Sequence, residues 1–228
     1  MSCQQNGTPQ KALILFTRYP QAGKVKTRLI KCLGPTGAAE LHRRMTEQVI
    51  RNIEPAVQRN KVQLQIYSCG GTEEEMQSWL GTDFLLTQQQ GNDLGERMLH
   101  AFVRTWRQGA ERVLLIGSDC PGIESSIIES GLKNLAGHDL VLGPAADGGY
   151  YLIGLRAGVR ANMQADAQQC RQHYNSLFRN IDWGSGQVLQ QTVRQAEKAG
   201  LSFALLPELH DIDRPEDLVH LNYYPDPE

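Results

Sequence analysis

The amino-acid sequence predicts a three-layer α/β protein, in which helices cover both faces of a mostly parallel central sheet. Two observations support this fold class. Short apolar runs, the clearest at residues 12–16 and 113–116, are too short for helices and suit strands that are buried on both faces. Segments with the apolar spacing of helices alternate with these runs, which is the order found in parallel sheets.

The elements follow from these patterns in chain order. We expect strands at 12–16, 62–67, 84–86, 113–116, 140–142, 150–155 and 203–206. Pro35 suits the first turn of a helix, Thr72 and Glu75 have the spacing of a capping box, and Asn92 or Asp93 can cap the following helix. Helices are therefore expected from 35, at 72–80, from about 93 to 108, near 125–135 and at 187–199.

Length and composition limit the class of protein. The 228 residues suit one large α/β domain, predicted at 11–228 after a polar tail at 1–10. With 23 basic and 25 acidic residues the net charge is −2, which argues against a general nucleic-acid or membrane-surface binder. The five cysteines form no CxxC pair, and no apolar run has the roughly 20 residues that span a bilayer. We expect a cytoplasmic protein, and its oligomeric state stays open.

The loop after the first strand carries a concentrated positive charge. Arg18, Lys24, Lys26 and Arg28 follow the buried run directly, and Gly23 lies among them. Lysine and arginine neutralise phosphates, and a glycine lets backbone N–H groups approach an anion. The Walker A pattern fails because it would need a glycine in place of Arg18 and a serine or threonine after Lys24. A phosphate-binding loop and a solvated basic loop both remain open.

An acidic residue follows the strand at 113–116. Asp119 lies in the sequence Gly-Ser-Asp-Cys-Pro and should be held at the ligand-binding edge of the sheet. Mg²⁺ and Mn²⁺ prefer such oxygen ligands and leave positions open for phosphates. Asp119 is thus a candidate metal ligand, and the alternative is a helix N-cap.

Two later segments have both a structural and a functional interpretation. Asp147-Gly148-Gly149 before Tyr150 is a good turn signal, but the glycines could also let a sugar or acceptor lie against bare backbone, beside the ring of Tyr150 or Tyr151. Near the C-terminus, residues 210–218 read His-Asp-Ile-Asp-Arg-Pro-Glu-Asp-Leu, where an aspartate could cap the helix that the proline starts. The alternative role for that aspartate is a second metal ligand.

Taken together and in order, these motifs resemble one family. They are the run 16–29 with Gly34, residues 90–98 (Gln-Gly-Asn-Asp-Leu-Gly-Glu-Arg-Met), 117–121, 147–155, 183–192 and 211–218. The set is similar to the bacterial DUF2064 family of glycosyltransferase-like proteins, over nearly the whole of residues 11–221. That family resembles the nucleotide-diphospho-sugar transferase (GT-A) superfamily, and more distantly the phospholactate guanylyltransferases and molybdenum-cofactor nucleotidyltransferases.

The resemblance implies roles for individual residues. The first loop would bind the nucleotide through Thr17, Arg18, Gly23, Lys24, Lys26 and Arg28, helped by Gln90, Asp93 and Ser118. It implies a Mg²⁺ or Mn²⁺ ion on Asp119, with Asp213, Asp211 or His210 as the second ligand. The acceptor would lie against Gly148, Gly149 and Tyr150, and Lys26, Arg28 and Asp147 would be catalytic, Asp147 by orienting or deprotonating an acceptor hydroxyl.

Three functions are compatible with these residues. The first is a metal-dependent glycosyltransferase that moves a sugar from a nucleotide-sugar to a small-molecule acceptor, with metal and basic loop stabilising the departing diphosphate. The second is a nucleotidyltransferase that couples a nucleoside triphosphate to a phosphorylated acceptor and releases pyrophosphate. The third is a non-catalytic nucleotide-binding module. A product assay distinguishes them.

Overall fold

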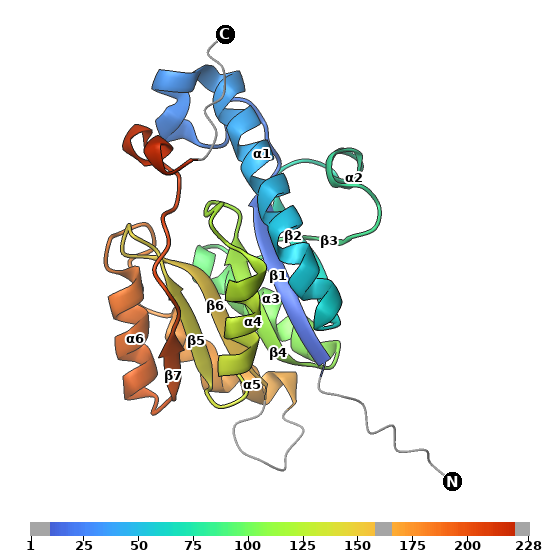
Figure 1. The fold of residues 1–228 in the computed structure, drawn as a ribbon. Helices are drawn as coiled ribbons and strands as arrows, with labels where there is room; N and C mark the ends of the chain where they lie inside the picture. Colours follow the sequence, from blue (N-terminus) through green and yellow to red (C-terminus); the bar gives the residue numbers. More distant parts are fainter. Residues whose placement is uncertain (1–9, 158–165, 222–228) are drawn as a thin grey trace.

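Seven strands form one sheet with helices on both of its faces, in a computed structural model that describes residues 10–157 and 166–221 (Figure 1). The order across the sheet is β3-β2-β1-β4-β6-β5-β7. The strands are β1 (Gln10–Arg18), β2 (Val62–Cys69), β3 (Leu85–Gln88), β4 (Ala110–Gly117), β5 (Leu140–Pro144), β6 (Tyr150–Arg156) and β7 (Phe203–Leu205). The predicted tail at 1–10 lies, except for Gln10, outside the described residues. The three-layer α/β prediction is confirmed.

The helices alternate with the strands. They are α1 (Ile30–Arg59), α2 (Glu73–Leu80), α3 (Leu94–Arg107), α4 (Ser125–Asn134), α5 (Ala167–Tyr174) and α6 (Val188–Lys198), with short 3₁₀ turns η1 (Thr27–Leu29), η2 (Asn175–Phe178) and η3 (Pro215–His220). Figure 1 places α1 and α4 on the near face of the sheet, with α3 and α5 behind it. Within the described ranges, no helix combines the length and apolar character that crossing a membrane requires.

The central strand β1 shows why the core has two halves. It pairs in parallel with β2 and β4, so that Leu13 lies beside Leu64 and Leu114. Side chains alternate across a strand. Leu13 belongs to the buried cluster that α1 and α4 cover, while Ile14 belongs to the cluster that α3, α5 and α6 cover. Because both faces are buried, the strand is a continuous apolar run rather than an alternating one.

One strand runs against the others. β6 is antiparallel to both β4 and β5, whereas the β1–β2, β1–β4, β2–β3 and β5–β7 pairs are parallel. The reason is the short connection at 145–149 between β5 and β6, because a connection of this length can join only antiparallel neighbours. The reversal brings the start of β6 to the edge where β1 and β4 end, and so adds residues 145–150 to that edge.

Local signals located most helix starts. Thr72 and Glu75 form the predicted capping box of α2, and the Asp93 carboxylate accepts a hydrogen bond from Glu96 N at the start of α3. The first long helix differs from the prediction, because helical turns begin before Pro35 and a kink at Gly34 (φ 68°) separates them from the main helix. The sequence patterns also did not predict α5 or η2.

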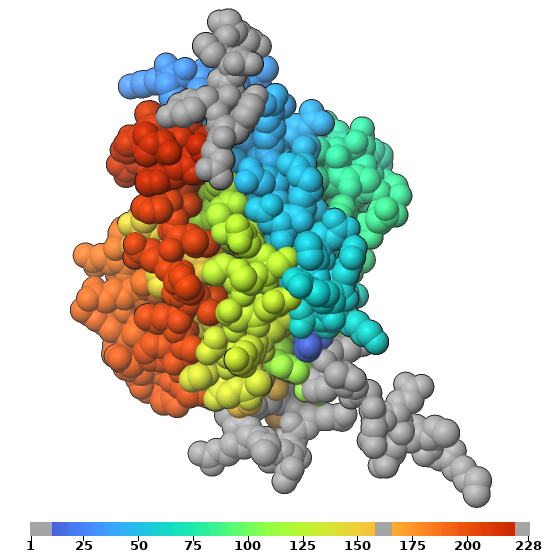
Figure 2. Space-filling view, viewed as in Figure 1, coloured from blue at the N-terminus to red at the C-terminus, as the bar shows by residue number. Residues whose placement is uncertain are grey.

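The C-terminal segment returns to the same edge of the sheet. From β7 it runs over the surface towards the amino-terminal part of α1, shown in red in Figures 1 and 2. Leu209 forms an isolated parallel bridge with Ala145, and Ile212 N donates to Asp119 O (2.9 Å). Ile212 and Leu218 then pack with apolar residues of η1 and α1, namely Leu29, Ala38, Leu41 and Met45. Residues 209–218 therefore lie beside the carboxyl ends of β1 and β4.

Asp139 should make stability depend on pH in the acid range. Its carboxylate accepts from Ser202 Oγ (2.6 Å) and Ser202 N (3.0 Å) and lies 3.4 Å from Arg156 Nη2, which ties the starts of β5 and β7 together. Burial raises the pKa of Asp139, but these donors outweigh burial and hold the pKa below its ordinary value. A lowered folded-state pKa contributes stability above the unfolded pKa of about 4, and this stability is lost as the pH falls through the folded pKa.

Asp139→Asn is therefore expected to lower the free energy of unfolding by about 1–3 kcal/mol at pH 7. Urea unfolding at pH 7 and pH 3 measures it, and the gap to the wild type should shrink at pH 3. The matched control Asp83→Asn, at an exposed position, should change stability by less than about 0.5 kcal/mol at either pH. An equal deficit at both pH values would show that the Asp139 carboxylate charge does not stabilise the fold.

Candidate functional site

A cavity of about 800 Å³ opens at the carboxyl ends of β1 and β4. Its walls come from the first loop, the end of β4, the β5–β6 connection, the start of α3, the segment before α6 and the C-terminal segment. The predicted site residues that line it are Thr17, Arg18, Lys24, Lys26, Arg28, Asp93, Ser118, Asp119, Asp147, Gly149, Tyr150, Asp211 and Asp213. Gly23, Gln90, Gly148 and His210 are not among the lining residues.

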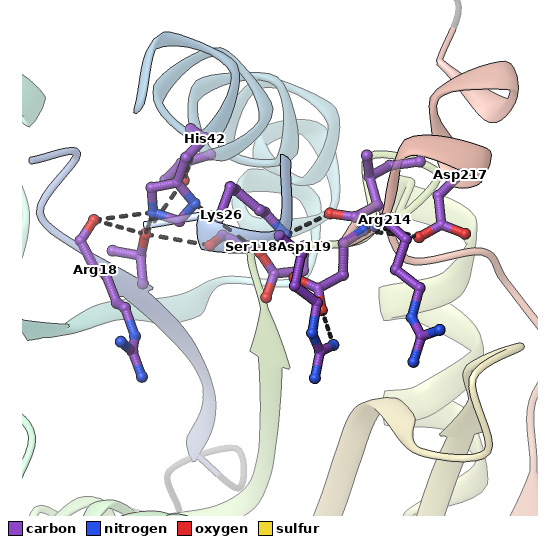
Figure 3. Close-up of polar contacts among 12 residues, drawn as sticks. Arg18, Lys26, His42, Ser118, Asp119, Arg214 and Asp217 are labelled. Atoms are coloured by element: carbon purple, nitrogen blue, oxygen red, sulfur yellow. Dashed lines mark hydrogen bonds and ion pairs between the residues drawn. The ribbon is translucent and has the colours of Figure 1, made fainter. Parts of the chain in front are cut away.

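Lys26 connects three of the segments that line this cavity. It adopts a left-handed backbone conformation (φ 47°, ψ 43°), which is uncommon for a residue with a side chain. Its side chain is only 3% exposed, and Nζ lies 2.6 Å from Asp119 Oδ1 and also donates to the Ile212 carbonyl (Figure 3). One ammonium group thus joins the first loop, the end of β4 and the C-terminal segment.

Asp119 faces the cavity, not a helix end. Helix α4 begins at Ser125 with Glu124 as its N-cap, so the capping alternative for Asp119 is not realised. The Asp119 side chain lines the cavity and is 55% exposed. Desolvation raises the pKa of Asp119. The nearby Lys26, His42 and Arg18 outweigh this effect and keep the pKa below its ordinary value. Asp119 is therefore ionised and open to ligand from the cavity side.

A buried polar network lies behind Asp119. Ser118 Oγ donates to Thr17 Oγ1 (3.2 Å), and Thr17 Oγ1 is 3.2 Å from Thr46 Oγ1. His42 Nε2 lies 3.0 Å from the Arg18 carbonyl oxygen, and its Nδ1 lies 3.9 Å from Asp119 Oδ1 (Figure 3). Burial lowers the pKa of His42 below its ordinary value, and the opposing effect of the Asp119 carboxylate is smaller. The hydroxyls of Thr17 and Ser118, which were predicted to bind nucleotide, thus hydrogen-bond within this buried network.

Sequence patterns gave no indication of His42. It occupies one turn of α1 between the core residues Leu41 and Met45, where a buried histidine looks like an ordinary packing residue. Only the packing of α1 over the ends of β1 and β4 brings it to Asp119.

The Asp-Gly-Gly turn has a structural reason for its first glycine. Gly148 has φ +87°, and a Cβ there would lie 2.1 Å from the Gly186 carbonyl oxygen. The turn is thus packed against the segment before α6, and the idea that an acceptor lies on Gly148 has no support in the cavity lining. Gly149 does line the cavity, and its N–H donates to Asp147 Oδ1 (2.8 Å), which orients that carboxylate.

The C-terminal aspartates have separate surroundings. The Asp213 carboxylate pairs with Arg28, while the Asp217 carboxylate accepts from Asp213 N (3.0 Å) and Arg214 N (2.7 Å) at the start of η3 (Figure 3). Asp217, not Asp211 or Asp213, is therefore the residue that caps this turn. Burial and, after it, the nearby Asp147 carboxylate raise the pKa of Asp211. Asp147 and Asp211 both line the cavity.

In the β3–α3 connection, Gln89 rather than the predicted Gln90 lines the cavity. Gln89 Nε2 donates to the Tyr67 carbonyl (3.0 Å) and the Thr17 carbonyl (3.3 Å). Gln90 instead presents its carbonyl to His100 Nδ1 (2.9 Å) outside the lining. Arg97 also lines the cavity and is held by Nε to the Gly91 carbonyl (3.1 Å). Of the two residues that the resemblance implied in this segment, Asp93 lines the cavity and Gln90 does not, while Gln89 lies there without having been predicted.

The donor set fits a divalent ion that shares its coordination with a ligand. Within residues 10–157 and 166–221, no three His, Cys, Asp or Glu side chains come together closely enough to enclose a metal. Mg²⁺ is commonly bound by only one or two carboxylates together with water and substrate phosphates. Asp119, with its open face and its orphaned neighbour His42 Nδ1, suits this kind of site.

The fold is similar to those of solved proteins that are named as a transferase and a synthase. A structure from Desulfovibrio desulfuricans G20, assigned by its name to the nucleotide-diphospho-sugar transferases, is 34% identical, with a TM-score of 0.79 over 92% of this chain and 85% of that one. The 4-diphosphocytidyl-2C-methyl-D-erythritol synthase of Anaerococcus prevotii DSM 20548 is 9% identical, with a TM-score of 0.56 over 93% and 97% of the two chains, which shows similarity of fold alone.

A curated relative and a family model complete the comparison. The 3-phospho-D-glycerate guanylyltransferase of Phenylobacterium zucineum (strain HLK1) is 34% identical over 113 residues, which are 48% of this chain and 43% of that protein. The chain thus matches less than half the length of this relative. The model of the family described as "Uncharacterized protein conserved in bacteria (DUF2064)" matches residues 52–185. Because that match spans more than half of the chain, the protein belongs to the DUF2064 family.

Proposed function

We propose that the protein is a nucleotidyltransferase that joins the nucleotidyl part of a nucleoside triphosphate to a small phosphorylated acceptor and releases pyrophosphate. The observation that carries this proposal is that the cations of the first loop and Asp119 meet in one cavity, with Lys26 Nζ 2.6 Å from the carboxylate. The 34% identity to a guanylyltransferase supports it. Nucleotidyl transfer was the second of the functions expected from the sequence, and the comparisons support it better than glycosyl transfer.

The first loop would hold the phosphates that leave. An oxygen of the acceptor phosphate attacks the α-phosphorus of the triphosphate, and the bond between that phosphorus and the oxygen bridging to the β-phosphate breaks. The negative charge that develops on pyrophosphate needs cations already in place. Lys24, Lys26 and Arg28 line the cavity on one side and are the groups we assign to this charge.

Lys26 has a further task in this scheme. Its ammonium now neutralises Asp119, and a triphosphate offers it a stronger anionic partner. Asp119 is then the carboxylate that would hold Mg²⁺ or Mn²⁺, and Asp211 is the second carboxylate we assign to the cavity. A bound divalent ion would supply charge stabilisation at the phosphates. Asp213, which pairs with Arg28, is the alternative second carboxylate, since it would be freed in the same way if Arg28 turned to the phosphates.

A second group of lining residues suits the acceptor. Asp147, Tyr150, Trp183 and Arg97 line the cavity, and the Asp147 carboxylate is oriented by Gly149 N–H. A phosphorylated acceptor is already ionised and needs no general base, so Arg97 would pair with its negative charge and Asp147 would orient it. In glycosyl transfer, by contrast, Asp147 would have to take a proton from an acceptor hydroxyl.

Glycosyl transfer remains the second candidate. The 34% identical structure named for the nucleotide-diphospho-sugar transferases favours it. Against it, Gly117 stands where the Asp-x-Asp motif of metal-dependent glycosyltransferases would have its first aspartate. The two reactions release different products, so one set of assays separates them.

The expected result is metal-dependent release of pyrophosphate from GTP in the presence of 3-phospho-D-glycerate or another small phosphorylated acid. Other triphosphates and acceptors are tested in parallel, because the base and acceptor are not specified by the cavity lining. Lys26→Met, which removes the ammonium and keeps the chain length, is the inactive control. Release of a nucleoside diphosphate from a nucleotide-sugar would instead identify a glycosyltransferase. Binding of nucleotide without either product would identify a non-catalytic module.

A further inference from the structure

His42 offers a ring nitrogen that nothing in the described protein uses. Its side chain is only 5% exposed, and Nδ1 is buried without a hydrogen-bond partner among the residues that the structure describes. Asp119 Oδ1 lies 3.9 Å from Nδ1. A buried polar atom without a partner costs free energy, so such an atom beside a cavity needs a reason.

The other ring nitrogen decides the tautomer. Nε2 lies 3.0 Å from the Arg18 carbonyl oxygen, which can only accept a hydrogen bond, so Nε2 carries the hydrogen. In the neutral ring Nδ1 then has a free lone pair directed towards the Asp119 carboxylate. Metal-ligating histidines usually have this arrangement, with the second ring nitrogen donating to a backbone carbonyl that fixes the ring.

A cation already occupies the place beside Asp119. Lys26 Nζ lies 2.6 Å from the same Oδ1 that His42 Nδ1 faces. Donors that each lie roughly 2.1 Å from one ion are separated by at most about 4 Å, so Nδ1 and Oδ1 are within the range for a shared ion. When Lys26 turns to a phosphate, as in the proposed function, a metal ion can take this place.

We infer that His42 Nδ1 and Asp119 together bind the divalent ion, and that the imidazole makes the site prefer Mn²⁺ or Co²⁺ over Mg²⁺. The inference rests on the proposed function for its metal, and it adds a nitrogen ligand from α1 to a site otherwise made of oxygen. Imidazole suits transition-metal ions, whereas Mg²⁺ favours oxygen ligands and water. The remaining coordination positions are left for water and phosphate oxygens.

The test uses Mn²⁺ alone and needs no substrate. In Lys26→Met the competing ammonium is absent, so this variant should bind Mn²⁺ at least tenfold more tightly than the wild type in an EPR titration. Pulsed EPR of the bound Mn²⁺ should show the modulation of a directly coordinated nitrogen. Labelling the protein with ¹⁵N-histidine should change that modulation from the ¹⁴N to the ¹⁵N pattern without altering any side chain.

Two variants made in the Lys26→Met background locate the nitrogen. His42→Gln can keep a donor to the Arg18 carbonyl but has no ring nitrogen, and it should lose the signal and at least tenfold of the Mn²⁺ affinity while Mg²⁺ affinity changes less than threefold. Thr46→Val perturbs the same buried network and should keep the signal. Bound Mn²⁺ without nitrogen modulation, modulation unaffected by histidine labelling, or no Mn²⁺ binding would each overturn the inference. None of these measurements depends on which group the enzyme transfers.

Discussion

Replacing Asp119 with asparagine is expected to lower the transfer rate by roughly 10²–10³-fold or more, because a preorganised charge at the reacting phosphates is lost. The amide has the same shape but carries no charge to hold a metal ion. It also leaves the Lys26 ammonium, which is 3% exposed, with the Ile212 carbonyl in place of a carboxylate. The pyrophosphate-release assay measures the rate, and urea unfolding measures the accompanying loss of stability.

A double-mutant cycle with Lys26→Met separates the two effects of this substitution. Removing one partner of a buried ion pair costs more than removing both, so the double variant should be more stable than Asp119→Asn alone. The exposure of Asp119 reduces this difference through solvent screening. Lys26→Met should be inactive, and the double variant should not recover the activity that Asp119→Asn loses. Full activity of Asp119→Asn with Mg²⁺ or Mn²⁺ would show that Asp119 holds no metal.

Gly148→Ala is expected to destabilise the fold by about 3–5 kcal/mol. The added Cβ would lie 2.1 Å from the Gly186 carbonyl oxygen, and both groups belong to backbone that cannot move independently, since Leu189 N also donates to the Gly148 carbonyl (2.9 Å). The positive φ of +87° adds its own cost for a residue with a side chain. Urea unfolding gives the free energy directly.

Gly184→Ala is the matched control because Gly184 also has φ +87° but no atom within 4 Å of its ideal Cβ position. It should cost only the roughly 1–2 kcal/mol of the left-handed conformation. The difference between the two variants therefore measures the steric contact alone. Equal effects would mean that the turn at 147–149 can move away from the segment before α6, and would reopen the possibility that a ligand lies against Gly148.

The local sequence determined most of the elements and the edge of the sheet where ligands bind. Short apolar runs with both faces buried predicted the strands, since side chains alternate across a strand whatever its neighbours are. Cap residues such as Thr72 and Asp93 predicted helix starts because their hydrogen bonds are made within one turn. The same reasoning placed Asp119 and the basic loop at one edge, because residues that follow parallel strands emerge together.

What the sequence could not determine depends on contacts between distant segments. The antiparallel direction of β6, the Arg28–Asp213 pair and the packing of Gly148 against Gly186 each join residues whose proximity no local pattern encodes. His42 is the clearest case, because its spacing on α1 is that of a core residue and only the docking of α1 over β1 and β4 sets Nδ1 beside Asp119. Local hydrogen bonding and periodicity specify elements, whereas the site is assembled by the packing that brings their ends together.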